Sequence, residues 1–246
     1  MLKKAVAVES PSPSSEPSPP IASSICWDCK SEVGGTYHCQ QCVKVQPLSK
    51  EGDYFEYFGI PRILNFDLED LESRYYTLSR KFHPDFFENK SPMEQSISLG
   101  NSAVLNTAYQ TLKDPTRRIH YLLELEAGTR KPLPATPPES LFEELMEVQD
   151  DIIAFKQSSN PHSEENLPVC DRLDASKALL EDQHKDFSLR LQTLALDWDS
   201  LVSNQTASKT KGISKESLLK KMRKLISDQS YVSRILNDIN ALRSIR

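Results

Sequence analysis

The chain has 246 residues, of which 26% are charged and 38% hydrophobic, with a net charge of −5 and a pI near 5.6. This length predicts two or three modest domains, and the composition is typical of a soluble, helix-rich protein. The acidic balance argues against general nucleic-acid binding, and no apolar run has the length of a membrane span.

Residues 1–25 are rich in proline and serine and contain almost nothing to bury. This composition predicts a disordered tail, because burial cannot offset the entropy lost on ordering the backbone. Lys3, Lys4 and the many serines also suit the remnant of an organellar transit peptide. Glu9, Glu16 and the lack of arginine speak against that remnant, so both interpretations stay open at this stage.

Two Cys-x-x-Cys pairs lie in residues 26–46, and their members are Cys26, Cys29, Cys39 and Cys42. Zinc takes four thiolates in a closed tetrahedral structural site, and this spacing predicts a zinc knuckle. Gly34 and Gly35 suit the turn between the pairs. So short a segment has no useful apolar core, and the metal would replace one. We expect metal removal to unfold only this segment, because the sequence offers no link between the cysteines and the later helices.

Other interpretations of the cysteines are two disulfides, a redox-active Cys-x-x-Cys, and a site in which His38 replaces one thiolate. Disulfides need an oxidising compartment, and no secretory signal is visible. A redox site normally lies in a βαβ setting that is absent from this sequence. His38 adjoins Cys39, and four cysteines already suffice for zinc. The distant Cys170 is interpreted as a plain helix residue.

Residues 52–127 show a helical pattern that is interrupted by His83-Pro84-Asp85. The apolar positions before this triplet recur at steps of three and four: Leu68, Leu71, Tyr75, Leu78 and Phe82. Pro84 ends that helix, because it disfavours the α conformation at His83 and has no N–H to donate. Three basic side chains lie off the apolar stripe and should face solvent: Arg74, Arg80 and Lys81. A second helix is expected around residues 105–112.

Residues 128–138 read as a proline-marked linker, and residues 139–246 contain three further amphipathic patterns. These predict helices over about 139–155, 171–201 and 214–242, joined into an up-down-up bundle. No phosphate-binding loop, nucleophile elbow or paired-carboxylate signature appears in the sequence. The predicted fold class is therefore mainly α.

A basic helix, a His-Pro-Asp loop and a returning helix resemble the J-domain, the module by which co-chaperones activate DnaK-type ATPases. The triplet alone is a weak signal, but three further stretches match the family in the right order: 53–60, 105–112 and 114–118. The resemblance assigns residues 52–127 to a J-domain helical hairpin.

A tetracysteine knuckle, a J-domain and a C-terminal helical bundle, in this order, resemble the eukaryotic HscB family of iron–sulfur cluster assembly. The aromatic pair Phe86-Phe87 and the Leu-Phe-x-x-x-Met-Glu helix at 141–147 are features that ordinary J-proteins lack. The resemblance implies a co-chaperone, not an enzyme, that stimulates a DnaK-type ATPase and delivers the cluster scaffold protein to it. It also implies the mitochondrial matrix, with the cytosol as an alternative, structural zinc as cofactor, and neither nucleic acid nor membrane as partner.

The resemblance also implies two sets of site residues. The chaperone-binding set is His83, Pro84, Asp85, Arg74, Arg80 and Lys81. The scaffold-binding set is Phe142, Met146, Glu147, Asp150 and Leu225. The family has an aromatic after Lys-(Leu/Met)-Arg on its last helix, and here Leu225 is the nearest apolar residue. Helical periodicity leaves Phe142 and Met146 near the edge of the buried stripe, so core and interface roles are both open for them.

Three rival functions fit parts of the sequence. A nucleic-acid-binding zinc module fits the knuckle, but the acidic balance and the lack of an aromatic-basic strip argue against it. A thiol oxidoreductase would need a reactive thiolate in one of the Cys-x-x-Cys pairs. A general J-protein that serves misfolded clients would share the J-domain but would not bind the scaffold.

Overall fold

The structure is a computed structural model that describes residues 25–33, 37–50, 52–128, 135–158, 166–204 and 214–243. The predictions made for residues 1–24 and for the Gly34-Gly35 turn lie outside these ranges. Within them, the only regular elements are helices, together with two isolated antiparallel β-bridges, Ile25 with Glu32 and His38 with Val45. The predicted mainly α fold is confirmed. No helix in the described ranges is both long enough and apolar enough to cross a membrane.

The described residues fall into two compact units. The first comprises those within Met1–Pro61 and Asp67–Lys113, and the second those within Arg62–Phe66 and Asp114–Arg246. The sequence assigned residues 52–127 to one domain, whereas the contacts place the helix Pro115–Ala127 (α4) with the C-terminal helices. The predicted domain boundaries stay predictions.

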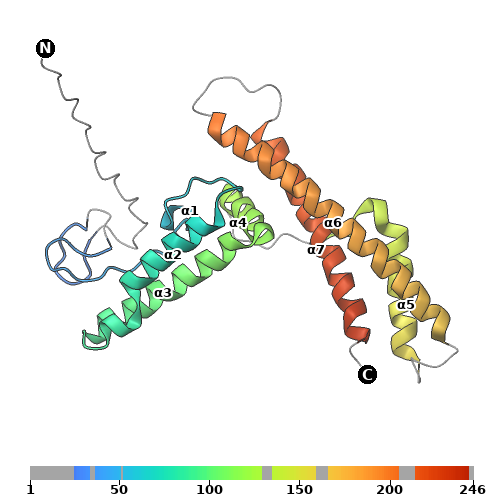
Figure 1. The fold of residues 1–246 in the computed structure, drawn as a ribbon, viewed down its shortest axis with the longest axis horizontal. Helices are drawn as coiled ribbons and strands as arrows, with labels where there is room; N and C mark the ends of the chain where they lie inside the picture. The colour runs from blue at the N-terminus through green and yellow to red at the C-terminus, as the bar shows by residue number, and fades with distance from the viewer. Residues whose placement is uncertain are drawn as a thin grey trace, which may run out of the picture. The chain divides into compact units, whose positions relative to one another are not determined.

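The first unit is a helical hairpin preceded by a short helix (Figure 1). It contains α1 (Tyr54–Tyr57), α2 (Leu68–Phe82), the 3-10 turn η1 (Pro84–Phe87) and α3 (Pro92–Lys113). Asp67 caps α2, because its carboxylate accepts from the Glu69 N–H at 2.9 Å. Leu71 and Phe82 of α2 are fully buried, as are Leu105, Ala108 and Leu112 of α3. Each of these buried leucine and phenylalanine side chains contributes about 1.5–3 kcal/mol by burial, so the predicted stripe holds the hairpin together.

The second unit is built on three helices that pack against one another (Figure 1). They are α5 (Phe142–Gln157), which follows the 3-10 turn η2 (Glu139–Leu141), then α6 (Leu167–Asn204) and α7 (Lys215–Arg243). The predicted three-helix bundle is confirmed, and α6 is longer at both ends than expected. Trp198 of α6 and Met222 and Ile226 of α7 lie in its core. Helix α4 packs on α7 in this unit.

The segment 62–66 joins the second unit through hydrogen bonds to α6. The Asp199 carboxylate accepts from the backbone N–H groups of Leu64 at 2.6 Å and Asn65 at 2.8 Å. Trp198 donates its indole N–H to the Arg62 carbonyl at 2.8 Å. The guanidinium of Arg118 on α4 donates to the Leu64 carbonyl. A short connecting segment is thus fixed to two helices that are distant in the sequence.

Candidate functional sites

The His-Pro-Asp loop, His83-Pro84-Asp85, lies where α2 ends. His83 has extended backbone angles, φ −61° and ψ 128°, and Pro84 opens η1, as the sequence predicted. Nδ1 of His83 lies 3.3 Å from the Asp85 backbone nitrogen and 3.4 Å from the Asp85 carboxylate. The His83 and Asp85 side chains are 50% and 74% exposed. Both are open to a partner.

The aromatic pair that follows the loop is divided between surface and core. Phe86 is 66% exposed, and its ring lies 6.1 Å from that of His83. Phe87 is buried and holds η1 against the hairpin. Phe86 therefore adds an apolar group to the exposed surface of the loop, a detail that the sequence did not distinguish.

The three predicted basic residues differ in their surroundings. Arg80 is exposed. Arg74 was expected to face solvent, but its guanidinium donates to the Phe58 carbonyl at 2.9 Å and to the Gly59 carbonyl at 3.2 Å, and it pairs with Asp70 at 2.9 Å. Arg74 is therefore tied to the carbonyls at the end of α1, while 39% of its side chain remains exposed.

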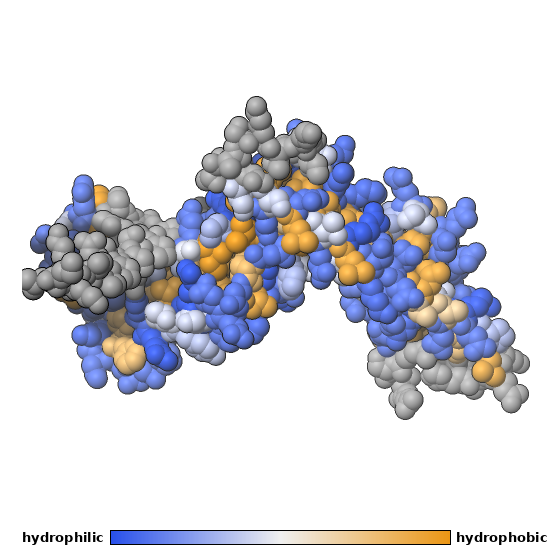
Figure 2. Space-filling view, turned by 45° about the horizontal axis from the view of Figure 1, so that its top comes forward, coloured by the Kyte–Doolittle hydropathy of each residue, from blue (hydrophilic) through white to orange (hydrophobic). Residues whose placement is uncertain are grey.

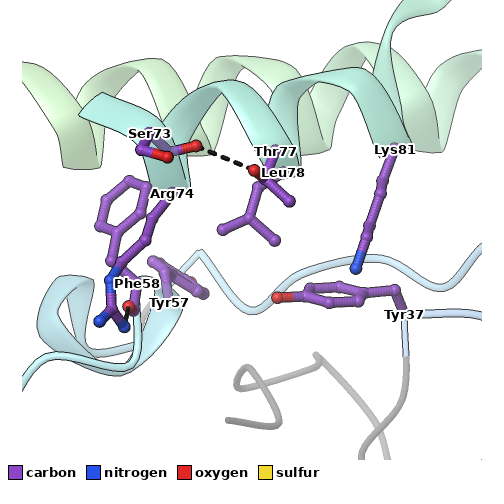
Figure 3. A pocket seen from close by; sticks show the side chains of 8 residues that line it. All are labelled: Tyr37, Tyr57, Phe58, Ser73, Arg74, Thr77, Leu78 and Lys81. Atoms are coloured by element: carbon purple, nitrogen blue, oxygen red, sulfur yellow. Dashed lines mark hydrogen bonds between the residues drawn. The ribbon is translucent and has the colours of Figure 1, made fainter. Parts of the chain in front are cut away.

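Lys81 is half-buried, and its ammonium lies 5.1 Å from the centroid of the Tyr37 ring. Figure 3 shows Tyr37 beneath Lys81, and Arg74 directed at Phe58. Between these residues α2 borders a groove of about 210 Å³, which is also lined by Tyr57. Only Arg80 therefore presents its charge fully to solvent among the three.

The cysteine knuckle, residues 26–46, brings its four cysteines together. Their Sγ atoms all lie within 4.8 Å of one another, with Cys26 to Cys42 and Cys29 to Cys39 at 3.6 Å. None of the four is in a disulfide. A tetrahedral zinc site with Zn–S near 2.3 Å would place sulfur atoms about 3.8 Å apart. The four thiols therefore have a geometry that fits a metal ion.

The two halves of the knuckle repeat the same backbone pattern. The Cys26 N–H donates to the Ser31 carbonyl and the Cys39 N–H to the Lys44 carbonyl, both at 2.8 Å. The N–H two residues after each of these cysteines points at its sulfur at 3.4 Å. The repeat orients both Cys-x-x-Cys pairs toward one centre, and backbone donors of this kind stabilise thiolates.

The knuckle thiols differ in their acidity. A hydrogen bond with the Ser31 hydroxyl, at 3.2 Å, lowers the pKa of Cys39 to about 6. Burial raises the pKa of Cys42 to about 12. Four adjacent thiolates repel one another, so a bound cation is what would allow all four to ionise together.

The knuckle is attached to α3, contrary to the expectation that nothing links the cysteines to the later helices. Lys44 forms an ion pair with the buried Glu94 at 2.8 Å, and this hydrogen bond lowers the pKa of Glu94 to about 2. Asn101 of α3 donates to the Gln46 carbonyl at 2.9 Å and accepts from the Leu48 N–H at 2.8 Å. The sequence did not predict this contact, because Glu94 and Asn101 are polar and do not add to the apolar periodicity of α3.

The α5 face carries the predicted scaffold-binding residues in exposed positions. Phe142 and Met146 are 52% and 48% exposed, while Leu145 and Val148 are buried. Glu147 and Asp150 are exposed beside them. Ile153, one turn further on and 50% exposed, lengthens the apolar stripe and was missed. Its signal was available, because 146, 150 and 153 share one side of a helix.

Leu225 differs from the other predicted scaffold-binding residues. It is only 6% exposed and lines a groove between α6 and α7 with Leu194. The α7 residue that borders a hollow together with Phe142 is its neighbour Lys224. Figure 2 shows a largely hydrophilic surface interrupted by hydrophobic patches on the helices. The roles of all these residues stay predictions.

Comparison with known proteins shows which proteins this chain is similar to. Residues 53–121 match the DnaJ domain family, so this part of the chain is a J-domain. The mouse iron-sulfur cluster co-chaperone protein HscB is 37% identical over 105 residues, which cover 41% of this chain and 45% of that protein. The HscB homolog of Arabidopsis thaliana is 30% identical over 135 residues, covering 55% and 53%. The matched part thus spans about half the length of these relatives.

The fold is similar over nearly the whole chain to one solved structure. The crystal structure of human co-chaperone protein HscB superposes with a TM-score of 0.62 at 24% identity, covering 90% of this chain and 98% of that one. The chain has a cysteine knuckle before its J-domain and a helical bundle after it, and it is similar to HscB co-chaperones in part of its sequence and in its fold.

Proposed function

We propose that this protein is a J-protein co-chaperone of iron–sulfur cluster assembly. Its J-domain stimulates ATP hydrolysis by a DnaK-type chaperone, and its bundle delivers the cluster scaffold protein to that chaperone. The observation that carries this proposal is the exposed His-Pro-Asp loop at the end of a helix whose last turn is basic, in a chain similar to HscB co-chaperones. The protein's own residues act by binding and perform no reaction.

The test is single-turnover ATP hydrolysis by a DnaK-type chaperone in the presence of the full-length protein. His83→Gln should abolish stimulation and leave the circular dichroism spectrum unchanged, because the exposed side chain acts by contact and not by packing. His184→Gln, the same substitution on α6, is the matched control. Full stimulation by His83→Gln would rule out the proposed J-protein activity.

The alternative is a general J-protein that delivers misfolded clients. The exposed α5 face with its acidic border favours a specific partner, because exposed apolar residues beside charges are the usual anatomy of a modest interface. A pull-down with the iron–sulfur scaffold protein separates the two functions. Recovery of unfolded clients without the scaffold would favour the general co-chaperone.

We propose zinc as the metal of the cysteine knuckle, where it would fix the fold of a segment with little apolar core. The four-cysteine ligand set is closed and offers no open position for a substrate, which supports a structural role. Metal content by emission spectrometry on protein purified under reducing conditions is the test. A zinc stoichiometry near zero would exclude zinc as the metal of the knuckle.

Similarity to the mouse and Arabidopsis co-chaperones favours the mitochondrial matrix over the cytosol as the compartment of this protein.

A further inference from the structure

One turn of α3 holds both the cysteine knuckle and the end of α2. Asn101 is 2% exposed, and its amide group contacts the backbone of Gln46 and Leu48 in the knuckle segment. Ser98 and Ser102 donate to the Phe82 carbonyl at 2.7 and 3.0 Å. Positions 98, 101 and 102 share one face of the helix. The knuckle and Phe82, the residue before His83, are therefore hydrogen-bonded to the same turn of α3.

The two serine hydroxyls satisfy a specific need of the chain at this point. Helix α2 ends at Phe82, and the Phe86 N–H, which would bond the Phe82 carbonyl in a continued helix, donates to the His83 carbonyl at 3.0 Å instead. A buried carbonyl without a partner is costly. The hydroxyls of α3 supply the missing donors and fix the peptide from which the His-Pro-Asp loop departs.

The knuckle also contacts the last two residues of α2, Lys81 and Phe82, through Tyr37. The Tyr37 ring meets the Phe82 ring edge-on, with centroids 5.2 Å apart, and lies under the Lys81 ammonium (Figure 3). The path from the metal ligands is short, because the Gln46 side-chain amide points at Sγ of Cys26 at 3.4 Å and donates to the Lys44 carbonyl at 2.8 Å.

We propose that the metal-bound knuckle positions the His-Pro-Asp loop for the chaperone, with Asn101 and Tyr37 as the two positioning residues. Metal at the four cysteines orders residues 44–48 against Asn101 and Tyr37 against Phe82, and this fixes the backbone at His83 and the side chain of Lys81. Loss of the metal therefore weakens chaperone stimulation at a distance from the cysteines. The inference rests on the proposed co-chaperone function.

The first test removes each connection while the cysteines stay intact. Asn101→Ala and Tyr37→Leu should retain the metal and their helix content but increase deuterium uptake in peptides covering residues 80–90. Each should raise the protein concentration that gives half-maximal stimulation on the order of fivefold, which corresponds to about 1 kcal/mol. Tyr37→Phe, which keeps the ring, should retain more stimulation than Tyr37→Leu, because the contacts with Phe82 and Lys81 are made by the ring. Thr107→Ala on the exposed side of α3 is the control.

The second test uses the unaltered full-length protein with its metal removed by chelation. Uptake should rise in residues 80–90 as well as in the knuckle, stimulation should fall, and added zinc should restore both. This arm keeps the proposal testable if Asn101→Ala does not fold. Unchanged uptake at residues 80–90 after metal removal, or normal stimulation by both variants, would overturn it.

The outcome for His83→Gln distinguishes a failure of the positioning role from a failure of the co-chaperone function. An inactive His83→Gln with fully active Asn101→Ala and Tyr37→Leu would leave the co-chaperone function standing and refute the positioning role. An active His83→Gln would refute the co-chaperone function itself, whatever the deuterium uptake shows.

Discussion

Two residues of the knuckle have left-handed backbone angles without being glycine. Lys30 has φ 64° and Val43 has φ 59°, and they stand at equivalent places, each directly after the second cysteine of a pair. An L-residue in this conformation costs about 1–2 kcal/mol because Cβ approaches the carbonyl oxygen. A β-branched residue such as Val43 is the worse of the two. The knuckle therefore folds against local strain, which the metal must offset.

We predict that Val43→Gly strengthens zinc binding several-fold, because glycine relieves the strain at a cost of about 0.5–1 kcal/mol in backbone entropy. Val43 is 74% exposed, so little packing is lost. Competition with a chromophoric chelator measures the affinity. Lys30→Gly is the matched variant and should gain less, since Lys30 also donates to the Trp27 carbonyl at 2.7 Å. Weaker zinc binding by Val43→Gly would contradict the strain argument.

Asp228 of α7 is a second residue in an unfavourable environment, because its carboxylate is buried. It is 5% exposed, its Oδ1 accepts no hydrogen bond from the described residues, and its nearest cation, Lys224, is 3.7 Å away. Burial raises the pKa of Asp228 above its ordinary 3.8. The unfolded chain therefore loses this proton more readily than the folded one, and the charged form disfavours folding at neutral pH.

Asp228→Asn should stabilise the second unit at pH 7 by on the order of 1 kcal/mol, because a buried charge is replaced by a neutral amide of the same size. The gain should shrink as the pH falls through the raised pKa and vanish below the ordinary value. Thermal unfolding between pH 3 and about 7 gives the comparison. Lys224→Gln, which removes the counter-charge, should act in the opposite direction. A stability gain that does not depend on pH would argue against the charge as its cause.

At the scale of helices, the sequence predicted what periodicity and punctuation encode. The stripe from Leu68 to Phe82 and the stop at Pro84 predicted the bounds of α2, and patterns of the same kind predicted the bundle helices. It did not predict that α4 packs against α7, because an amphipathic pattern indicates that one face of a helix is buried but not which element covers that face. Nor did it predict the hydrogen bonds made by Arg74 or Asn101. In a sequence, a polar side chain that bonds to the backbone cannot be told from one that faces water.

Asp199 illustrates such a contact between elements. It accepts hydrogen bonds from the backbone of Leu64 and Asn65 and from the Asn65 amide. Asp199→Ala should lower the stability of the second unit by roughly 1–3 kcal/mol, because these donors would lose a charged acceptor. Denaturant unfolding gives the free energy, and Asp197→Ala on the same helix is the control. Equal effects of the two substitutions would mean that the segment 62–66 is not held by Asp199.

At the scale of the whole molecule, the two proposed contacts lie in different units. The His-Pro-Asp loop belongs to the first unit, and the α5 face belongs to the second. A co-chaperone that brings a chaperone and a scaffold together needs two sites that can be occupied at once, and separate units can supply them. This division predicts that damage to one site leaves the other working.

The double substitution Phe142→Ala, Met146→Ala tests that independence. The two side chains lie four residues apart on α5, and both are about half exposed, so they pack little in the free protein. As central apolar residues of an interface they should contribute about 1–2 kcal/mol each, which predicts scaffold binding weakened on the order of a hundredfold. Glu147 and Asp150 at the border should affect the association rate more than the affinity.

Isothermal titration against the scaffold protein measures the affinity, and the single-turnover ATPase assay without scaffold should give unchanged stimulation. The matched control is Leu189→Ala, Leu196→Ala, two leucines of α6 that are 62% and 59% exposed and lie off the α5 face. If the control weakened scaffold binding as much, general loss of exposed apolar area would explain the effect. If the Phe142 and Met146 substitutions left scaffold affinity unchanged, the α5 face would not be the contact, and the bundle would have to bind the scaffold elsewhere.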